Sequence, residues 1–358
     1  MSGLGNFSST ELQKALAGKE VNADLSLANT RQYLTAHSTP KDLETMFQMS
    51  YLYFTNVKKD EKQFQNLMTQ LDMALKNKSL SPDAVFSDSV ATTTYGHNPR
   101  FNNPQVEDLK DINYDRILQI AKERFQNAAQ FTFVIAGNFD EQTIRPLIEQ
   151  YLGSLPSQKK VEKSKKIDAD FKGEVVNSFK HKAETPKAIA VMFWYSKKLP
   201  YTSENSIKAS MVGQILSMEY LKKIREDASA AYTVGASAGV STDDFENNST
   251  IYVYCPMKPE KADVALQIMR DEVQAITKGC DPDKLAKVKE YMLKNHADQL
   301  KQNNYWMTTI DMWRYKGVDL HKDYEEQVNA QTPESIAAFV KEVLKAGNRA
   351  EVVMMPAE

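Results

Sequence analysis

The chain has 358 residues, enough for two domains or for one large one. Its hydrophobic fraction of 42% and charged fraction of 26% are ordinary for a globular protein and exclude fibrous and wholly disordered classes. Lys and Arg number 45 and Asp and Glu number 47, which gives a net charge of −2. Because this balance gives no general attraction to polyanions, neither nucleic acid nor an anionic membrane surface is expected as a partner.

Cysteine content and apolar runs exclude further classes. The two cysteines, Cys255 and Cys280, cannot form a disulfide framework or a four-thiolate zinc site. The longest apolar run is Ala188–Tyr195, eight residues, whereas about 20 are needed to span a bilayer. The N-terminal stretch Met1–Gly5 has neither a basic region nor an apolar core, so no signal peptide is expected at this start.

An internal repeat is the first organising feature. Ala121–Phe125, typical of an amphipathic helix, is followed by the apolar stretch Phe131–Gly137. Near the C-terminus, Val340–Leu344 is followed in the same way by Ala350–Pro356. The offset is 340 − 121 = 219 residues. We therefore predict that each pair is a helix, a short polar turn and a buried strand.

Two further pairs share this offset. The candidate helix-capping residues Asn113 and Thr332 are 332 − 113 = 219 apart. Pro40 and Pro259, each between a predicted strand and a predicted helix, are also 259 − 40 = 219 apart. The chain is therefore predicted to contain two copies of one fold.

The repeat also predicts the domain boundaries. The second copy begins near Phe171, after the polar, lysine-rich stretch 157–170, which is typical of a linker. Subtracting the offset gives 171 − 219 = −48, so the first copy lacks about 50 residues on its N-terminal side. We expect a truncated domain over 1–156 and a complete domain over 171–358.

The second copy shows a clear order of elements. In chain order we predict strands Glu174–Lys180 and Ala188–Tyr195, a helix Ser203–Glu226, strands Tyr232–Val240 and Ser249–Pro256, helices Pro259–Thr277, Pro282–Gln302, Tyr305–Tyr315 and Pro333–Lys345, and a last strand Arg349–Met355. Strands separated from a run of helices indicate an α+β fold, an antiparallel-rich sheet with helices packed on one face.

Catalytic signatures are absent from the sequence. No two histidines lie within four residues of each other, so neither His-Glu-x-x-His nor its inverse, His-x-x-Glu-His, occurs. His181 and Glu184 begin like the inverse motif, but Thr185 stands where the second ligand belongs. There is also no Gly-x-Ser-x-Gly elbow and no glycine-rich phosphate loop. We therefore expect no catalytic residue and no metal site in this chain.

Several stretches resemble one enzyme family. In Leu221–Tyr232, Ile224-Arg225, six further residues and Tyr232 resemble the Leu-Arg-x6-Tyr stretch of insulinase/pitrilysin-type (inverzincin) zinc metallopeptidases. Phe131–Asp140, with Val-Ile-Ala-Gly-Asn-Phe, and Tyr151–Pro156, with Leu-Gly-Ser-Leu-Pro, resemble a strand and a domain ending of that family. Tyr95–Pro99 is similar to its Gly-x-x-Pro loop. The order of these stretches is most similar to the C-terminal half of the long-chain bacterial members.

The resemblance implies a larger protein. That family carries four related α+β domains in two halves that close like a shell, with zinc and the inverse motif in the first domain. This chain resembles the third domain, truncated, and the complete fourth. The implied partners are the zinc-bearing N-terminal half and a peptide or unfolded protein substrate. The parent protein is implied to be periplasmic or secreted.

Arg225 and Tyr232 are the substrate-binding residues that the resemblance implies. A tyrosine hydroxyl can donate to a carbonyl that develops negative charge, and a guanidinium can hold substrate carbonyls with its fork of donors. Without the resemblance, Arg225 would be a cation at a helix C-terminus and Tyr232 a residue of a strand core.

Three functions fit the sequence. The first is the C-terminal half of a zinc endopeptidase, inactive alone. The second is a stand-alone non-catalytic subunit that pairs with a separate zinc-bearing chain, and the third is a binding or scaffold protein. An open reading frame upstream of Ser2 that contains His-x-x-Glu-His would identify the first, and a neighbouring gene with that motif would favour the second.

Overall fold

The computed structural model describes residues 2–28, 30–96, 98–158, 161–163, 165, 171–182, 187–242 and 248–357. The chain divides into two compact units. The first comprises Met1–Asn77 and Pro104–Lys166, and the second comprises Lys78–Asn103 and Ile167–Glu358. Most of the predicted linker 157–170 lies outside the described residues.

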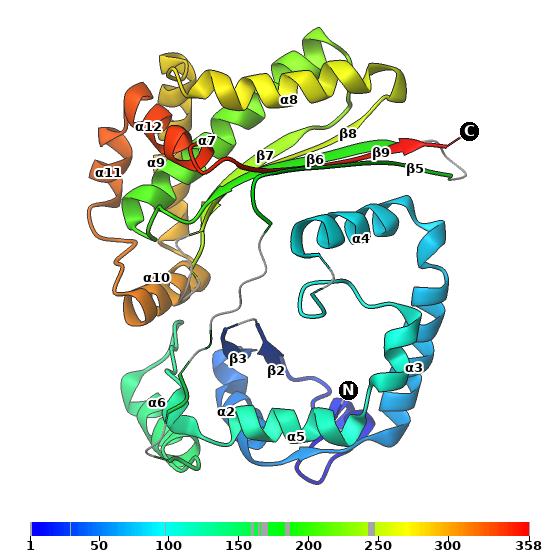
Figure 1. The fold of residues 1–358 in the computed structure, drawn as a ribbon. Coiled ribbons are helices and arrows are strands. Elements are labelled where there is room, and N and C mark those ends of the chain that lie inside the picture. The colour runs from blue at the N-terminus through cyan, green and yellow to red at the C-terminus, as the bar shows by residue number, and fades with distance from the viewer. Residues whose placement is uncertain are drawn as a thin grey trace. The chain divides into compact units, whose positions relative to one another are not determined.

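The second unit is built on a five-stranded sheet in the order β5-β9-β6-β8-β7 (Figure 1). Its strands are β5 (Glu174–His181), β6 (Ala188–Ser196), β7 (Gly235–Val240), β8 (Ser249–Met257) and β9 (Asn348–Pro356). β5 and β9 run parallel, and the other neighbours are antiparallel. Every residue of the central strand β6 is buried, which requires cover on both faces of the sheet. The predicted antiparallel-rich sheet is confirmed.

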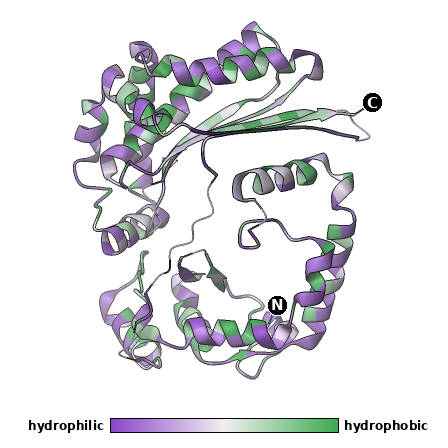
Figure 2. Ribbon diagram, viewed as in Figure 1, coloured by the Kyte–Doolittle hydropathy of each residue, from purple (hydrophilic) through white to green (hydrophobic). Residues whose placement is uncertain are grey.

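Helices cover one face of this sheet, as the sequence predicts. α7 (Ser203–Tyr220), α8 (Ala262–Ile276) and α12 (Pro333–Leu344) share one core with the strands. The largest fully buried side chains of that core are Met192, Met211, Ile215, Leu216, Tyr220, Ile224, Ile251 and Met269. The remaining helices of the unit are α9 (Pro282–Gln299), α10 (Asn303–Lys316) and α11 (Tyr324–Ala330). Figure 2 shows the apolar character of the strands beneath these helices.

The opposite face of the sheet carries α4 (Pro82–Tyr95), which precedes the second copy in the sequence (Figure 1). Phe86 of α4 is buried in a second core against β6 and β9, and Val90 packs on the same cluster. Asn177 of β5 adds two hydrogen bonds, to Ser89 Oγ at 2.9 Å and to Thr93 Oγ1 at 2.8 Å. The sheet of the second unit is therefore covered on both faces, and one cover comes from the first copy of the repeat.

The first unit is mostly helical. Its helices are α1 (Ser9–Ala15), α2 (Leu43–Thr55), α3 (Glu61–Lys76), α5 (Tyr114–Phe125) and α6 (Glu141–Leu147), and α6 continues as a π-helix over Ile148–Leu152. Its strands are β1 (Gly3–Leu4), β2 (Val21–Leu27), β3 (Gln32–Ser38) and β4 (Val57–Lys58). β2 and β3 form an antiparallel ribbon, and β1 pairs with β4.

The helix boundaries confirm the 219-residue offset. α5 spans 114–125 and α12 spans 333–344, so both ends differ by 219. α2 begins at Leu43 and α8 at Ala262, again 219 apart. The predicted capping residues Asn113 and Thr332 both accept a hydrogen bond from the third residue of their helix. The two copies therefore share the positions of these helices and of their N-terminal caps.

One prediction from the repeat is wrong: Phe131–Gly137 contains no strand. Its counterpart β9 lies between β5 and β6 and is hydrogen-bonded to both. Among the described residues, no strand lies beside Phe131–Gly137 in the way that β5 and β6 lie beside β9. A segment without neighbouring strands has no ladder to join, so the apolar pattern alone does not make it a strand.

Candidate functional site

The segment that carries Arg225 and Tyr232 begins with α7. Its N-cap is Thr202, whose hydroxyl accepts from the amide of Asn205 at 3.0 Å. The sequence predicted one helix over Ser203–Glu226, but α7 ends at Tyr220 and a π-helix follows over Leu221–Asp227. Such wide turns are rare and occur often at functional sites.

A tight turn ends this helix. The amide of Ala230 donates to the carbonyl of Ile224 at 2.8 Å, six residues back. Between them Ser229 has φ of 51°, one of two non-glycine residues with positive φ among those described. This is the arrangement of a left-handed helix cap, which glycine usually occupies.

The loop after the turn is tied to the start of the next helical segment. Lys258 donates its backbone amide to the carbonyl of Ala230 at 2.8 Å, and Lys261 Nζ donates to the carbonyl of Ala228 at 2.6 Å. Ala230 and Ala231 are buried. The loop therefore has a fixed shape immediately before Tyr232.

Tyr232 points away from this anchored loop. Its side chain is 80% exposed, and the strand predicted over Tyr232–Val240 begins only at Gly235, so the alternative of a strand-core tyrosine is wrong. Arg225 is also exposed, and its Cζ lies 5.2 Å from the centroid of the Tyr232 ring, within the range of a cation–π contact. Among the described residues, neither the phenol hydroxyl nor the guanidinium has a hydrogen-bond or ion-pair partner.

Two lysines near Arg225 are paired with carboxylates. Lys222 lies 2.9 Å from Asp227, and this hydrogen bond raises the pKa of Lys222 above its ordinary value. Lys223 lies 2.6 Å from Glu272. Arg225 is exposed, whereas these two lysines are each held by a carboxylate. An exposed cation and an exposed phenol side by side can bind peptide carbonyls.

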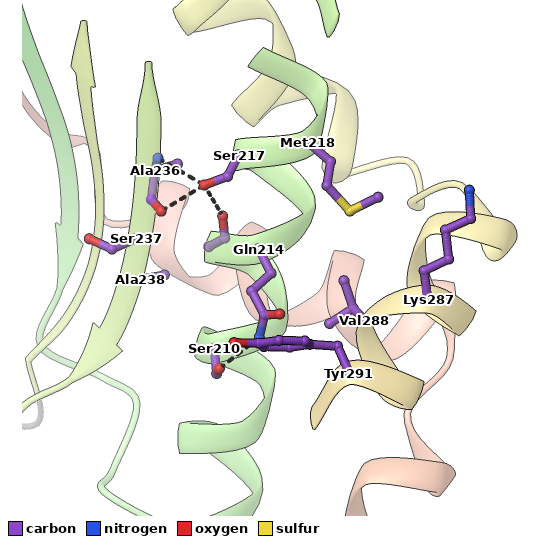
Figure 3. Close-up of a pocket in the computed structure, with 11 residues that line it drawn as sticks. Ser210, Gln214, Ser217, Met218, Ala236, Ser237, Ala238, Lys287, Val288 and Tyr291 are labelled. Carbon is purple, nitrogen blue, oxygen red and sulfur yellow. Dashed lines mark hydrogen bonds between the residues drawn. The ribbon is translucent and has the colours of Figure 1, made fainter. Parts of the chain in front are cut away.

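A cavity that was not predicted from the sequence lies beside α7. It has a volume of about 470 Å³ and lies between α7, β7 and α9 (Figure 3). It is lined by Ser210, Gly213, Gln214, Ser217, Met218, Ala236, Ser237, Ala238, Lys287, Val288 and Tyr291. The only sequence signal was a run of small and polar residues on one face of an otherwise apolar helix.

The described residues contain no cluster that could bind a metal ion, and the Cys255 thiol is not reactive. Across them, no three His, Cys, Asp or Glu side chains lie close enough together to hold a metal ion. His97, Glu184 and Thr185 lie outside the described residues. Burial raises the pKa of the Cys255 thiol to about 12, which keeps it protonated and unreactive at neutral pH.

His296 forms a buried aromatic cluster with residues of two other segments. It is 3% exposed, its ring stacks on Tyr324 at a centroid distance of 4.2 Å, and the ring of His321 is 6.0 Å away. Burial, and next the neighbouring His321, lower the pKa of His296 below the ordinary value of 6.5, while Glu325 acts in the opposite direction. The folded protein therefore favours the neutral imidazole.

We predict that this histidine makes the second unit sensitive to acid. Below pH 6.5 the unfolded chain binds a proton that the folded chain resists, so stability is complete above that pH and falls as the pH is lowered. His296→Phe, which keeps a ring in the stack, should flatten the fall in melting temperature between pH 8 and pH 5. The exposed His37→Gln should leave it unchanged, and an equal fall in all three proteins would contradict this role.

Within the described residues, no helix is both long enough and apolar enough to cross a membrane.

Comparison with known proteins agrees with this fold. The chain is 22% identical over 96% of its length to the probable zinc protease PqqL of Escherichia coli, and 22% identical over 75% to a PQQL-like zinc protease of Arabidopsis thaliana. These matches cover only 37% and 30% of the two relatives, so the chain spans about a third of their length.

Solved structures show the same architecture. The periplasmic protease PqqL from Escherichia coli matches 99% of the chain with a TM-score of 0.84 at 21% identity, over 39% of its own length. The peptidase M16 inactive domain from Pseudomonas fluorescens matches 99% of the chain and 86% of that domain, with a TM-score of 0.78 at 13% identity. The family model of the peptidase M16 inactive domain matches residues 111–292, just over half of the chain. The chain therefore belongs to the peptidase M16 inactive-domain family.

Proposed function

We propose that this chain is the non-catalytic C-terminal half of a zinc-dependent endopeptidase, which closes the reaction chamber and binds the peptide. The observation that carries the proposal is the match to the inactive domain together with relatives that are named zinc proteases and are about three times as long. Because the described residues hold no cluster of metal ligands, the zinc belongs to the other half in this proposal.

Arg225 and Tyr232 are proposed to hold the substrate. The guanidinium would bind a backbone carbonyl of the peptide, and the phenol hydroxyl would donate to the carbonyl oxygen that gains negative charge during hydrolysis. Neither group has a hydrogen-bond or ion-pair partner within the described residues, and backbone hydrogen bonds hold the loop just before Tyr232. A donor fixed in advance stabilises a developing charge without a further reorganisation cost.

The proposed substrate is a peptide or an unfolded protein, and the proposed compartment is the periplasm. The solved relatives include a periplasmic protease and a ferredoxin protease, FusC, in complex with Arabidopsis ferredoxin. The chain also matches the first half of PqqL with a TM-score of 0.70 at 14% identity, so its fold also occurs in the first half of such a protease.

The alternative is a stand-alone subunit that pairs with a separate zinc-bearing chain. It is supported by solved proteins of similar length, such as a protease from Helicobacter pylori of which the chain covers 87%. Both proposals place the zinc elsewhere, and they differ in whether one gene or two genes encode the assembly.

The experiment combines this chain with the zinc-bearing part, encoded either upstream in the same frame or in a neighbouring gene. Peptide hydrolysis is expected from the mixture and from neither component alone. An Arg225→Ala, Tyr232→Phe double variant should still bind the other part but should not restore full hydrolysis. Full activity of the zinc-bearing part alone would contradict the proposed role.

A further inference from the structure

A cavity remains between α7, β7 and α9 because the residues on the facing sides of α7 and β7 are small. A Cβ built on Gly213 would meet the backbone of Ser237 and Ala238 at 2.9 Å, so the glycine allows α7 to lie directly against β7. The walls farther out are Met218, Val288 and the ring of Tyr291 (Figure 3). The result is a hollow with apolar walls at the edge of the sheet.

The outer edge of β7 is closed at this point. Ser217 Oγ accepts from the amide of Ala236 at 3.0 Å and can donate to the carbonyl of the same residue at 2.9 Å (Figure 3). In an antiparallel sheet these two groups would otherwise be free to pair with an added strand. Because Ser217 occupies the backbone amide and carbonyl of Ala236, an added strand could not pair with β7 at this residue. A peptide bound here would be recognised mainly through a side chain.

The lining favours one class of side chain. Among the eleven described lining residues none is acidic, and the one charged group is Lys287. A lysine or arginine side chain would meet no carboxylate there. Ser210 and Gln214 are hydrogen-bonded to each other at 3.3 Å and lie beside the ring of Tyr291 (Figure 3). This combination of a ring, apolar walls and a few polar atoms is typical of a site for an aromatic group.

Two short stretches of chain connect the lining of the cavity with Arg225 and Tyr232. On the helical side, Leu221 is the first residue of the π-helix after α7; it follows Met218 by three residues, is 39% exposed, and precedes Arg225 by four. On the strand side, Tyr232 precedes Ala236 by four residues, at most about 14 Å of extended chain. A peptide held at Arg225 and Tyr232 would therefore reach the cavity with a residue no more than about four positions away.

We propose that this cavity is a specificity pocket that takes an aromatic side chain, Phe or Tyr, of the peptide held by Arg225 and Tyr232. The assignment of the ligand as a peptide rests on the proposed function. The cavity itself is a separate site, since none of its lining residues belongs to the Arg225–Tyr232 pair. Its chemistry can therefore be measured on this chain alone.

The test uses three small probes, N-acetyl-phenylalaninamide, N-acetyl-alaninamide and N-acetyl-lysinamide, titrated against the 358-residue chain by ligand-observed NMR. Burying an aromatic side chain should make the phenylalanine amide bind roughly tenfold more tightly than the other two. Ser210→Trp should remove that preference, because the exposed Ser210 lies at the cavity and a large ring would fill it.

Matched variants distinguish filling of the cavity from loss of the Ser210 hydroxyl and from the general effect of adding a tryptophan. Ser210→Ala keeps the space and should retain the preference, as should Ala338→Trp on the exposed side of α12. Arg225→Ala with Tyr232→Phe should also retain it, because the probe occupies the cavity only. Equal affinity for the three amides, no detectable binding, or an unchanged preference in Ser210→Trp would overturn the pocket. Failure of the proposed function would instead appear as unchanged peptide hydrolysis in the Arg225 and Tyr232 variants.

Discussion

Tyr232→Phe is expected to lower kcat/KM for peptide hydrolysis by the assembled protease by roughly 100- to 1000-fold, or about 2.7–4 kcal/mol. The substitution removes one hydroxyl that is proposed to donate to the developing oxyanion. The side chain is 80% exposed and its hydroxyl has no partner among the described residues, so the change should leave folding intact. The measurement is steady-state hydrolysis of a fluorogenic peptide together with the melting temperature.

The pattern of kinetic constants separates the possible roles. A contact made only in the transition state lowers kcat and kcat/KM together, whereas a ground-state contact mainly raises KM. Tyr252→Phe, which removes the hydroxyl of a β8 tyrosine that is 37% exposed, is the matched control and should have no kinetic effect. If Tyr232→Phe and Arg225→Ala both leave kcat/KM unchanged, the two residues do not hold the substrate.

Arg270→Ala is expected to destabilise the second unit by about 3–5 kcal/mol. Glu351 lies on β9 with only 3% of its surface exposed, and Arg270 of α8 holds it through two hydrogen bonds, one of them between Nε and Oε2 at 3.0 Å. Removing the guanidinium leaves a buried carboxylate without its counter-charge. Urea unfolding, followed by circular dichroism, measures the change.

Two controls test the cause of that loss. Arg270→Leu combined with Glu351→Leu should be much more stable than Arg270→Ala, because no unpaired charge remains buried. Arg145→Ala breaks the exposed pair with Glu141 and should cost less than about 1 kcal/mol. A loss from Arg270→Ala as small as that from Arg145→Ala would show that water reaches Glu351.

Much of the local structure follows from the sequence. The strands around Ala188–Tyr195 and Ser249–Pro256 were predicted to within one residue, because short apolar or alternating runs bounded by turns have few other solutions. The caps at Asn113 and Thr332 follow from local chemistry, since a side-chain oxygen there satisfies a free backbone amide. These features depend on neighbours in the sequence.

The features that depend on distant partners were not predictable. Phe131–Gly137 has a strand pattern but no strands beside it. The packing of α4 on the sheet of the second unit requires knowledge of which face is open. The cavity beside α7 depends on the approach of Gly213 to β7, and the pairing of Arg225 with Tyr232 depends on the turn at Ser229. The resemblance in sequence pointed to Arg225 and Tyr232, but their geometry is visible only in the structure.

In the proposed assembly, this chain binds substrate while another part of the protease holds the zinc. The most direct measurement is the zinc content of each component in the reconstitution, determined by mass spectrometry after exhaustive dialysis and compared with its peptide hydrolysis. We predict no stoichiometric zinc and no hydrolysis for the 358-residue chain, and one zinc in the other part. One tightly held zinc per copy of this chain, with hydrolysis by the chain alone, would contradict the account.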